Sequence, residues 1–277
     1  MSASKVYLKT VDRALQVLLQ FDEAHPVWSA DELAAVLGLH RSIIYRILAT
    51  LEHSRFVTQN GKRGMFRLGP SLVSLGNVVL SGIDLRQVAA PRMADVVRET
   101  GETAFLTVLS GDESVCIDKV ESPIPIRVTL TIGSRHPLHA GASNKILLAY
   151  LPKAQIETYI AEGLNPITPN TIVEADLLKK DLEEIRRKGF AFSIGELTPG
   201  MAAIGAPILD SNGSLEGALS ISGLSTSFGD ERLPMLVQAV CRAAEDISSQ
   251  LLTWKQKPTE SGPYPQLRQM DDHSWLE

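Results

Sequence analysis

Four polar side chains in one short segment have the types and the spacing needed to read a nucleic acid. They are Arg41, Ser42, Tyr45 and Arg46. Because they recur three to four residues apart, they share one face if the segment is helical. An arginine can grip the O6 and N7 atoms of guanine with two hydrogen bonds, and such a pair contributes about 1–3 kcal/mol of discrimination. An ordinary solvated helix face has the same pattern, so the spacing alone leaves both interpretations open.

Four further residues could hold the phosphate backbone around such a helix. His40 stands just before it and could donate to a phosphate, and Arg13 could add a contact from an earlier helix. Lys62 and Arg63 stand in a turn-rich stretch, residues 59–64, from which they would track the backbone next to the minor groove. Together with the helix residues, they make the predicted set of contacts to double-stranded DNA.

Two helices are expected ahead of the one that carries these residues. Thr10 is the expected N-cap of a first helix, whose apolar residues recur at helical spacing up to Phe21. Ser29 and Glu32 have the spacing of a capping box and begin a short second helix. Gly38 is expected to end that helix, because glycine readily adopts the left-handed conformation of a C-cap.

The third helix and a hairpin complete the expected unit. The helix spans 41–51, and its apolar face would join the core. That face consists of Ile43, Ile44, Ile47, Leu48 and Leu51. Residues 56–58 and 65–68 have strand-like character on either side of the basic turn. Helix, helix, turn, helix and hairpin is the order of a winged helix-turn-helix, predicted here over residues 1–69.

Length, charge and cysteine usage restrict the class of protein. At 277 residues the chain is long for one core, which favours two domains. The net charge is −5, but residues 1–69 carry +3 and the remainder carries −8, so the basic part could bind a polyanion alone. Cys116 and Cys241 suggest neither a disulfide framework nor a zinc ribbon. With no signal peptide and no apolar run that could span a bilayer, we expect a cytoplasmic protein and no membrane partner.

The rest of the chain predicts a second domain behind a linker. A connecting helix is expected over 71–80, inside a linker at 70–82. Strands are expected at 103–110, 114–121, 126–132, 190–195, 202–209 and 215–222, and helices at 83–100, 143–150, 153–162, 174–188 and 230–252. Strand segments flanked by helices favour an α+β or mixed α/β domain over 83–254 with a largely antiparallel sheet. Residues 255–277 are polar and aperiodic, and we expect a disordered tail.

Two stretches of the second domain have chemistry that suits a small ligand. Small residues from Ala140 to Ser143 lead into an apolar helix, whose free N–H groups could bind a carboxylate or a phosphate. Alternatively, Ser143 only caps that helix. Ser220 and Ser222 lie on one face of a strand, where their hydroxyls could line a polar pocket or face water.

Metal and enzyme chemistry have weaker support. His136 and His139 are three residues apart, but Pro137 stands between them and no carboxylate or thiolate is near in sequence, so we expect a turn with a hydrogen-bonding imidazole. The sequence lacks a GxSxG elbow, a P-loop, a GxGxxG fingerprint and an HExxH motif. We therefore expect no metal, no cofactor and no catalytic residue. Catalysis by residues distant in sequence, or a protein-interaction module that has lost DNA binding, remain alternatives.

Six stretches of the chain carry a likeness to a known family. They are TVDRALQVLLQF, ELAAVLGLHRSIIYRILATLE, MFRLGPSLVSLG, GETAFLTVLSG, IGSRHPLHAGASNKILLAYLP and GALSISG. In this order they resemble the IclR family of bacterial transcriptional regulators, over about residues 10–250. The resemblance implies an N-terminal winged helix-turn-helix, a linker helix and a C-terminal GAF-like domain that binds a small effector. It also implies homodimers or homotetramers, whose paired winged helix-turn-helix domains bind a palindromic operator.

The resemblance also implies an effector site at six positions. They are Ala142, Ser143, Ser193, Ala203, Ser220 and Ser222. Family members often have an acidic residue at the position of Ser193 and polar residues around Gly195 and Ala203, whereas here these positions are small or apolar. The predicted protein is a repressor or activator whose operator binding changes when a small organic acid, such as a carboxylate, binds the second domain.

Overall fold

The computed structural model describes residues 8–22, 24–59, 61, 64–81, 84–123 and 130–256. They belong to two compact units, one reaching to Gly82 and the other beginning at Ile83. No single helix in the described part of the chain is long and apolar enough to cross a membrane. Only a helix pair bent by 119° meets the length and composition criteria.

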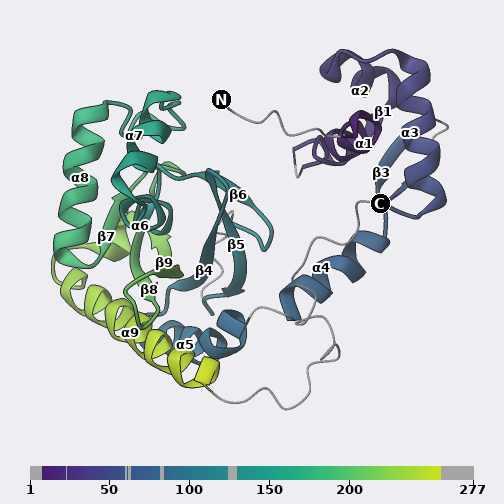
Figure 1. The fold of residues 1–277 in the computed structure, drawn as a ribbon. Coiled ribbons are helices and arrows are strands. Elements are labelled where there is room, and N and C mark those ends of the chain that lie inside the picture. The colour runs from purple at the N-terminus through teal and green to yellow at the C-terminus, as the bar shows by residue number, and fades with distance from the viewer. Residues whose placement is uncertain are drawn as a thin grey trace, which may run out of the picture. The chain divides into compact units, whose positions relative to one another are not determined.

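The first unit combines helices with a three-stranded sheet (Figure 1). Its elements are α1 (Lys9–Leu18), β1 (Trp28–Ser29), α2 (Ala30–Leu37), α3 (Arg41–His53), β2 (Val57–Gln59), β3 (Met65–Leu68) and α4 (Ser71–Ser81). The strands pair antiparallel in the order β1-β3-β2, so β2 and β3 form the hairpin that follows α3. This arrangement is a winged helix-turn-helix, as the sequence predicts.

Local chemistry fixes both ends of α2. The Ser29 hydroxyl accepts a hydrogen bond from the Glu32 N–H at 3.2 Å, and the Glu32 carboxylate accepts one from the Ser29 N–H at 2.8 Å. This is the predicted capping box. Gly38 ends the helix with a φ of 63°, a left-handed conformation that a residue with a Cβ adopts only with strain. The sequence therefore determines where the turn to α3 begins.

Helix α1 and the first strand differ from expectation. The N-cap of α1 is Leu8 rather than Thr10, and no side chain caps the helix, because the predicted capping hydroxyl lies inside the helix instead of before it. The helix also ends at Leu18, before Phe21, although Phe21 still packs against the core. Strand β1 has only two residues, which is too short for an alternation of apolar and polar residues to reveal it.

One apolar core joins the helices and the hairpin of the first unit. Its buried members are Val17, Ala30, Leu33, Ile44, Ile47, Leu48, Val57 and Phe66. Ile43 and Leu51, also predicted to be core, are half-buried against this cluster. Because α3 turns its apolar side inward, its polar side is left at the surface.

The second unit is built on a six-stranded antiparallel sheet in the order β6-β5-β4-β9-β8-β7. Its strands are β4 (Thr103–Ser110), β5 (Glu113–Val120), β6 (Arg135–Pro137), β7 (Ala191–Ile194), β8 (Met201–Leu209) and β9 (Leu215–Leu224). Its helices are α5 (Asp84–Thr100), α6 (Ala142–Ala149), α7 (Lys153–Ala161), α8 (Ala175–Lys188), the short 3-10 turn η1 (Ser225–Phe228) and α9 (Leu233–Gln256). The predicted α+β class with a largely antiparallel sheet is confirmed.

Helices cover both faces of this sheet (Figure 1). Helices α5 and α9 pack together against one face, while α6 packs on β8 and β9 with α8 outside it. Gly205 on β8 permits a close approach, since a Cβ at this position would stand 3.0 Å from the Ser143 nitrogen. The first turn of α6 therefore rests directly on the backbone of the sheet.

Two boundaries of the second unit need correction. The strand predicted over 126–132 lies partly outside the described residues, and its last three residues are not in a strand; residues 135–137 form β6 instead. Helix α9 continues to Gln256, so Lys255 and Gln256 are helical rather than part of a tail. The remainder of the predicted tail lies outside the described residues.

Candidate nucleic-acid interface and candidate ligand pocket

The outer face of α3 carries the polar residues that the sequence singles out. The side chains of Arg41, Ser42, Tyr45 and Arg46 are all exposed. Ile44, Ile47 and Leu48, on the opposite face, are buried. A helix with a fixed apolar side and an exposed row of donors can enter a major groove without disturbing its own core.

His40 has a structural task at the start of α3. Its Nδ1 accepts a hydrogen bond from the Ser42 N–H at 3.3 Å and lies 2.8 Å from the Ser42 hydroxyl, so the imidazole is the N-cap of the helix. A neutral imidazole that accepts at Nδ1 carries its hydrogen on Nε2. Nε2 is therefore the atom from which His40 could donate to a phosphate.

Arg41 is held by two neighbours. Its Nε lies 2.7 Å from Oδ1 of Asp31, at the start of α2. Its Nη2 donates to the Tyr45 hydroxyl at 3.1 Å, and the guanidinium carbon lies 5.3 Å from the centre of the Tyr45 ring. The hydrogen bond to Tyr45 and the charge of Asp31 raise the pKa of Arg41 above its ordinary value. Asp31 is absent from the predicted set, although an acidic residue in the first turn of the neighbouring helix is a signal that a search for partners of Arg41 could have used.

The remaining predicted DNA contacts lie on α1 and at the tip of the hairpin. Arg13 and Arg46 both line a groove of about 360 Å³ between α1 and α3, with an apolar floor that includes Ala14 and Ile47. Two guanidinium groups from different helices therefore border one groove. Lys62 and Arg63 lie outside the described residues, and their contacts remain a prediction.

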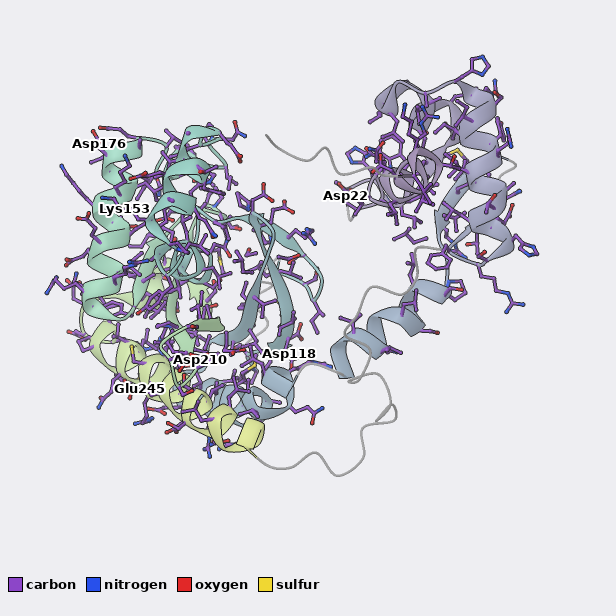
Figure 2. All side chains as sticks on the ribbon, viewed as in Figure 1. Asp22, Asp118, Lys153, Asp176, Asp210 and Glu245 are labelled. Carbon is purple, nitrogen blue, oxygen red and sulfur yellow. The ribbon has the colours of Figure 1, made fainter. Side chains whose placement is uncertain are left out.

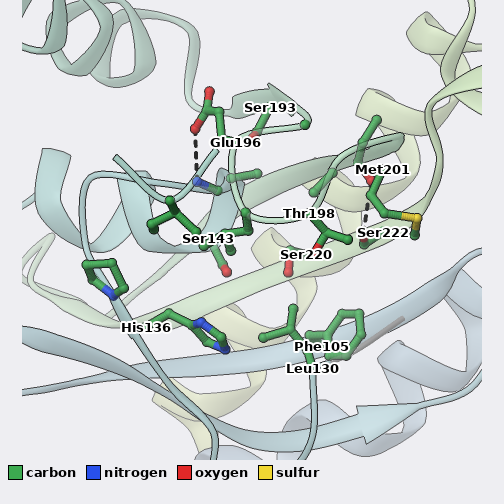
Figure 3. A pocket seen from close by; sticks show the side chains of 18 residues that line it. Phe105, Leu130, His136, Ser143, Ser193, Glu196, Thr198, Met201, Ser220 and Ser222 are labelled. Carbon is green, nitrogen blue, oxygen red and sulfur yellow. Dashed lines mark hydrogen bonds between the residues drawn. The ribbon is translucent and has the colours of Figure 1, made fainter. Parts of the chain in front are cut away.

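A cavity of about 280 Å³ in the second unit brings together all six residues of the implied effector site. Ala142 and Ser143 come from the start of α6, Ser193 from β7, Ala203 from β8, and Ser220 and Ser222 from β9. Figure 3 shows Ser143, Ser193, Ser220 and Ser222 around the space, with Phe105, Leu130 and His136 across from them. The described lining thus combines hydroxyls on one side with apolar side chains on another.

Register places the two strand serines in the cavity. Ser220 pairs with Gly205, and Ser222 pairs with Ala203, so both hydroxyls lie on the sheet face under α6. Ser222 donates to the carbonyl of Ala202 at 2.9 Å, which fixes its direction (Figure 3). Both serines are buried. The alternative that they face water is therefore wrong.

Helix α6 begins at the cavity wall with Gly141 as its N-cap, and no side chain of the described residues makes a capping hydrogen bond there. The first N–H groups of a helix have no partner within it. The N–H of Gly141 is taken by Oε2 of Glu196 at 2.9 Å (Figure 3). The N–H groups of Ala142 and Ser143 follow it at the cavity wall and, with the helix dipole, suit an acceptor such as a carboxylate oxygen.

A buried ion pair next to the cavity was not predicted. Lys145 on α6 is 1% exposed, and its Nζ lies 2.6 Å from Oε1 of Glu196 and 2.9 Å from Oδ2 of Asp181 on α8. Glu196 itself lines the cavity and is buried. The available signal was the single lysine within the apolar run of α6, because a buried lysine requires an acidic partner.

The histidine pair forms no metal site. His139 is buried; its Nδ1 lies 2.9 Å from the Tyr159 hydroxyl and its Nε2 lies 2.9 Å from the carbonyl of Asn165. The Tyr159 hydroxyl also accepts from the N–H of Leu138 at 2.8 Å. Both ring nitrogens are thus engaged, and in the described part of the chain no group of His, Cys, Asp and Glu could hold a metal ion. Burial raises the pKa of Tyr159, so it is a neutral hydrogen-bonding group here.

An exposed polar face on the second helix of a helix-turn-helix, followed by a hairpin, defines a DNA-binding protein of the winged-helix class. The chain matches the IclR helix-turn-helix domain over residues 10–61 and the C-terminal domain of bacterial IclR transcriptional regulators over residues 77–249. The chain belongs to the IclR family. Members of this family are transcriptional regulators and not enzymes, so this chain is a helix-turn-helix transcriptional regulator.

Individual relatives span nearly the same length. The regulator KipR of Bacillus subtilis is 31% identical over 244 residues, which are 88% of this chain and 97% of KipR. The solved structure of an IclR regulator from Alicyclobacillus acidocaldarius is 28% identical, has a TM-score of 0.78, and is aligned over 88% of this chain and 99% of that one. An IclR homolog from Microbacterium hydrocarbonoxydans, solved in complex with 4-hydroxybenzoate, has the same fold with a TM-score of 0.74, at 24% identity and over 87% and 98% of the two chains.

Proposed function

We propose that this regulator binds a palindromic DNA operator through α3 and releases or strengthens that binding when a small organic acid occupies the cavity of the second unit. The observation that carries the proposal is the convergence of six predicted residues on one cavity beside free N–H groups of α6. Arg41, Ser42, Tyr45 and Arg46 would face the base edges. The phosphate contacts would come from Arg13, His40, Lys62 and Arg63.

The lining defines the chemical class of effector. A carboxylate would accept from the N–H groups of Ala142 and Ser143, while the Ser220 hydroxyl would bond a second polar group. Phe105 and Leu130 would contact an apolar body. The 4-hydroxybenzoate complex of the Microbacterium homolog supports this proposal at the level of the fold, since a protein of the same fold has been solved in complex with an aromatic acid.

Coupling between effector binding and DNA binding requires that the ligand prefer one arrangement of the winged helix-turn-helix domains. A ligand can shift DNA affinity only by the difference between its own affinities for the two arrangements, and such couplings are typically about 1–3 kcal/mol. Helix α4 connects the winged helix to the second unit along the chain and is the element that would carry the change. Whether DNA is released or favoured depends on which arrangement the ligand prefers.

A ligand screen followed by a double substitution tests the effector site. A panel of carboxylic acids and their amides is screened by thermal shift, and the best acid is used in DNA-binding titrations. Ser220→Ala with Ser222→Ala should weaken binding of that acid by roughly tenfold and leave DNA binding without it unchanged. Ser211→Ala, in an exposed turn, is the matched control. An unchanged response in the double variant would place the effector elsewhere.

A further inference from the structure

The contact between Asp31 and Arg41 joins the two helices of the helix-turn-helix across its exposed surface. The acid stands in the first turn of α2 and the arginine at the first residue of α3. Their side chains are 60% and 59% exposed, and the 2.7 Å contact is made at the Nε edge of the guanidinium. An ion pair this exposed contributes little to folding, because water and salt screen it. Its effect is therefore to restrict where the guanidinium lies.

The contacts of Arg41 leave several of its N–H donors available for a ligand. A guanidinium has five N–H donors, one on Nε and two on each Nη. Asp31 pairs with the Nε edge by charge, at 2.7 Å, and the Tyr45 hydroxyl accepts one hydrogen bond from Nη2. At the Nη end, one donor on Nη2 and two on Nη1 remain for a ligand. That end is the fork that grips guanine O6 and N7.

Arg46 provides the contrast within the same helix. In the described part of the chain its side chain has no ion pair and no hydrogen bond to another side chain; only its carbonyl accepts, from Thr50. Arg46 can therefore turn toward either a base or a phosphate. Arg41 cannot do so without giving up two partners.

We infer that Asp31 is a specificity-determining residue, which, with Tyr45, holds Arg41 in the direction that reads a base and keeps it from binding phosphates at any sequence. This inference rests on the proposed reading of DNA by α3. Two consequences follow from the geometry. Ordering Arg41 before binding lowers the entropy lost at the correct site. The carboxylate of Asp31 also repels a phosphate that approaches Arg41 from the Nε side.

Selection from random duplexes with the wild-type protein supplies the DNA probe for the test. Affinities of wild type and Asp31→Asn are then measured by fluorescence anisotropy for the selected duplex and for a scrambled duplex, over a range of salt. Asp31→Asn is expected to bind the scrambled duplex more tightly, with a salt slope steeper by about one phosphate contact. The ratio of selected to scrambled affinity should fall roughly tenfold, which corresponds to about 1.4 kcal/mol.

Three variants separate orientation from charge and from stability. Asp22→Asn removes the same charge from an exposed site in the same unit and should leave the ratio unchanged (Asp22 is labelled in Figure 2). The Asp22 carboxylate lies 3.4 Å from Nδ1 of His25. Asp31→Glu keeps the charge and should restore most of the ratio, while Tyr45→Phe removes the other acceptor and should lower it. Thermal melts show whether each variant is folded.

The outcomes distinguish this inference from the proposed function. If Asp31→Asn and Asp22→Asn change the ratio equally, Asp31 acts only through its charge and the inference is wrong, while base reading by α3 stands. If the folded wild type enriches no sequence at all, base reading by α3 fails and the inference fails with it. If the ratio falls in Asp31→Asn, is mostly restored in Asp31→Glu and is unchanged in Asp22→Asn, both stand.

Discussion

Arg41 and Arg46 differ in their surroundings although both belong to the exposed face of α3. Arg41 is held between Asp31 and Tyr45, whereas Arg46 borders the groove that Arg13 also lines. A fixed guanidinium favours discrimination, and a mobile one favours affinity, because the mobile side chain can follow whichever acceptor the DNA presents. Substitution of Arg41 and substitution of Arg46 should therefore have different effects on DNA affinity and on discrimination between sequences.

Arg46→Ala is expected to weaken the selected duplex by roughly tenfold or more, the amount that one arginine contact contributes. If Arg46 reads a base, the preference at one position of the duplex should relax; if it holds a phosphate, affinity should fall equally for all sequences and the salt slope should decrease by about one. Anisotropy titrations on a set of single-base variants of the duplex measure both. Arg98→Ala, in the second unit, removes another exposed arginine as a control. A substitution at Arg46 without any effect would exclude the proposed contact.

At the scale of elements, α6 is positioned from both ends by other elements. At its start, Glu196 in the segment between β7 and β8 binds both the Gly141 N–H and Lys145. At its end, Arg186 on α8 donates to the carbonyls of Ala149 and Leu151. Thr171 donates to the backbone carbonyl of Glu196 and Thr168 donates to that of Gly195, which fixes this segment further. The N–H groups proposed to bind the effector are thereby held in place before any ligand arrives.

Because the ion pair of Lys145 and Glu196 is buried, removing one partner should lower the free energy of unfolding more than replacing both partners. Glu196→Gln alone should lower the unfolding free energy by about 1–3 kcal/mol, because the buried Lys145 loses its closest charged partner and keeps only Asp181 at 2.9 Å. Lys145→Met together with Glu196→Gln should recover most of the loss, since a neutral pair needs no buried charge to be compensated. Asp181, which is less buried, would then be left to water. Chemical denaturation measures both values.

A matched control tests the reasoning behind this pattern. Glu184→Gln removes a carboxylate of an exposed cluster with Arg187 and Lys188 on α8, and should change the unfolding free energy little, because water and salt screen these pairs. If the double variant is as unstable as Glu196→Gln, then Lys145 and Glu196 stabilise the segment between β7 and β8 by shape and hydrogen bonds rather than by charge.

At the scale of the whole molecule, exposed apolar faces in the first unit support the proposed assembly. On α1 the exposed apolar side chains are Leu8, Val11, Leu15 and Leu19, which follow one another at helical spacing. On α4 they include Val73, Leu75 and Val79. Isolated apolar residues at a surface are ordinary, but a continuous helical stripe is not. We propose that a second copy covers these faces, which would also place two winged helix-turn-helix domains on a palindrome.

Leu15→Lys is expected to shift the protein toward monomers and to weaken binding of a palindromic duplex more than binding of a single half-site. Leu15 is 54% exposed, so the substitution should not disturb the core of the first unit. Gln16→Lys introduces the same charge at the next residue of α1, which is also exposed, and serves as the control. Sedimentation velocity gives the size of the particle. Equal sizes for the two variants and the wild type would show that the α1 stripe is not part of an interface.

Features that depend on neighbours a few residues away could be predicted from the sequence. The capping box at Ser29, the turn at Gly38 and the two faces of α3 follow from spacing within one or two helical turns, and local interactions settle such features. The two-residue strand β1 and the N-cap of α1 were missed, because a single hydroxyl such as Thr10 is a weak signal and tertiary pairing creates the short strand.

Contacts between residues that are distant in sequence could not be predicted and became visible in the folded structure. The cavity gathers the six positions that the likeness to a family indicated, and the packing of α6 on β8 and β9 decided that the shared face of Ser220 and Ser222 lies toward it. Glu196 meets Lys145 across 51 residues, and Asp31 meets Arg41 across a turn. No local pattern specifies such pairs, because they form only when packing of the helices and the sheet brings their backbones together.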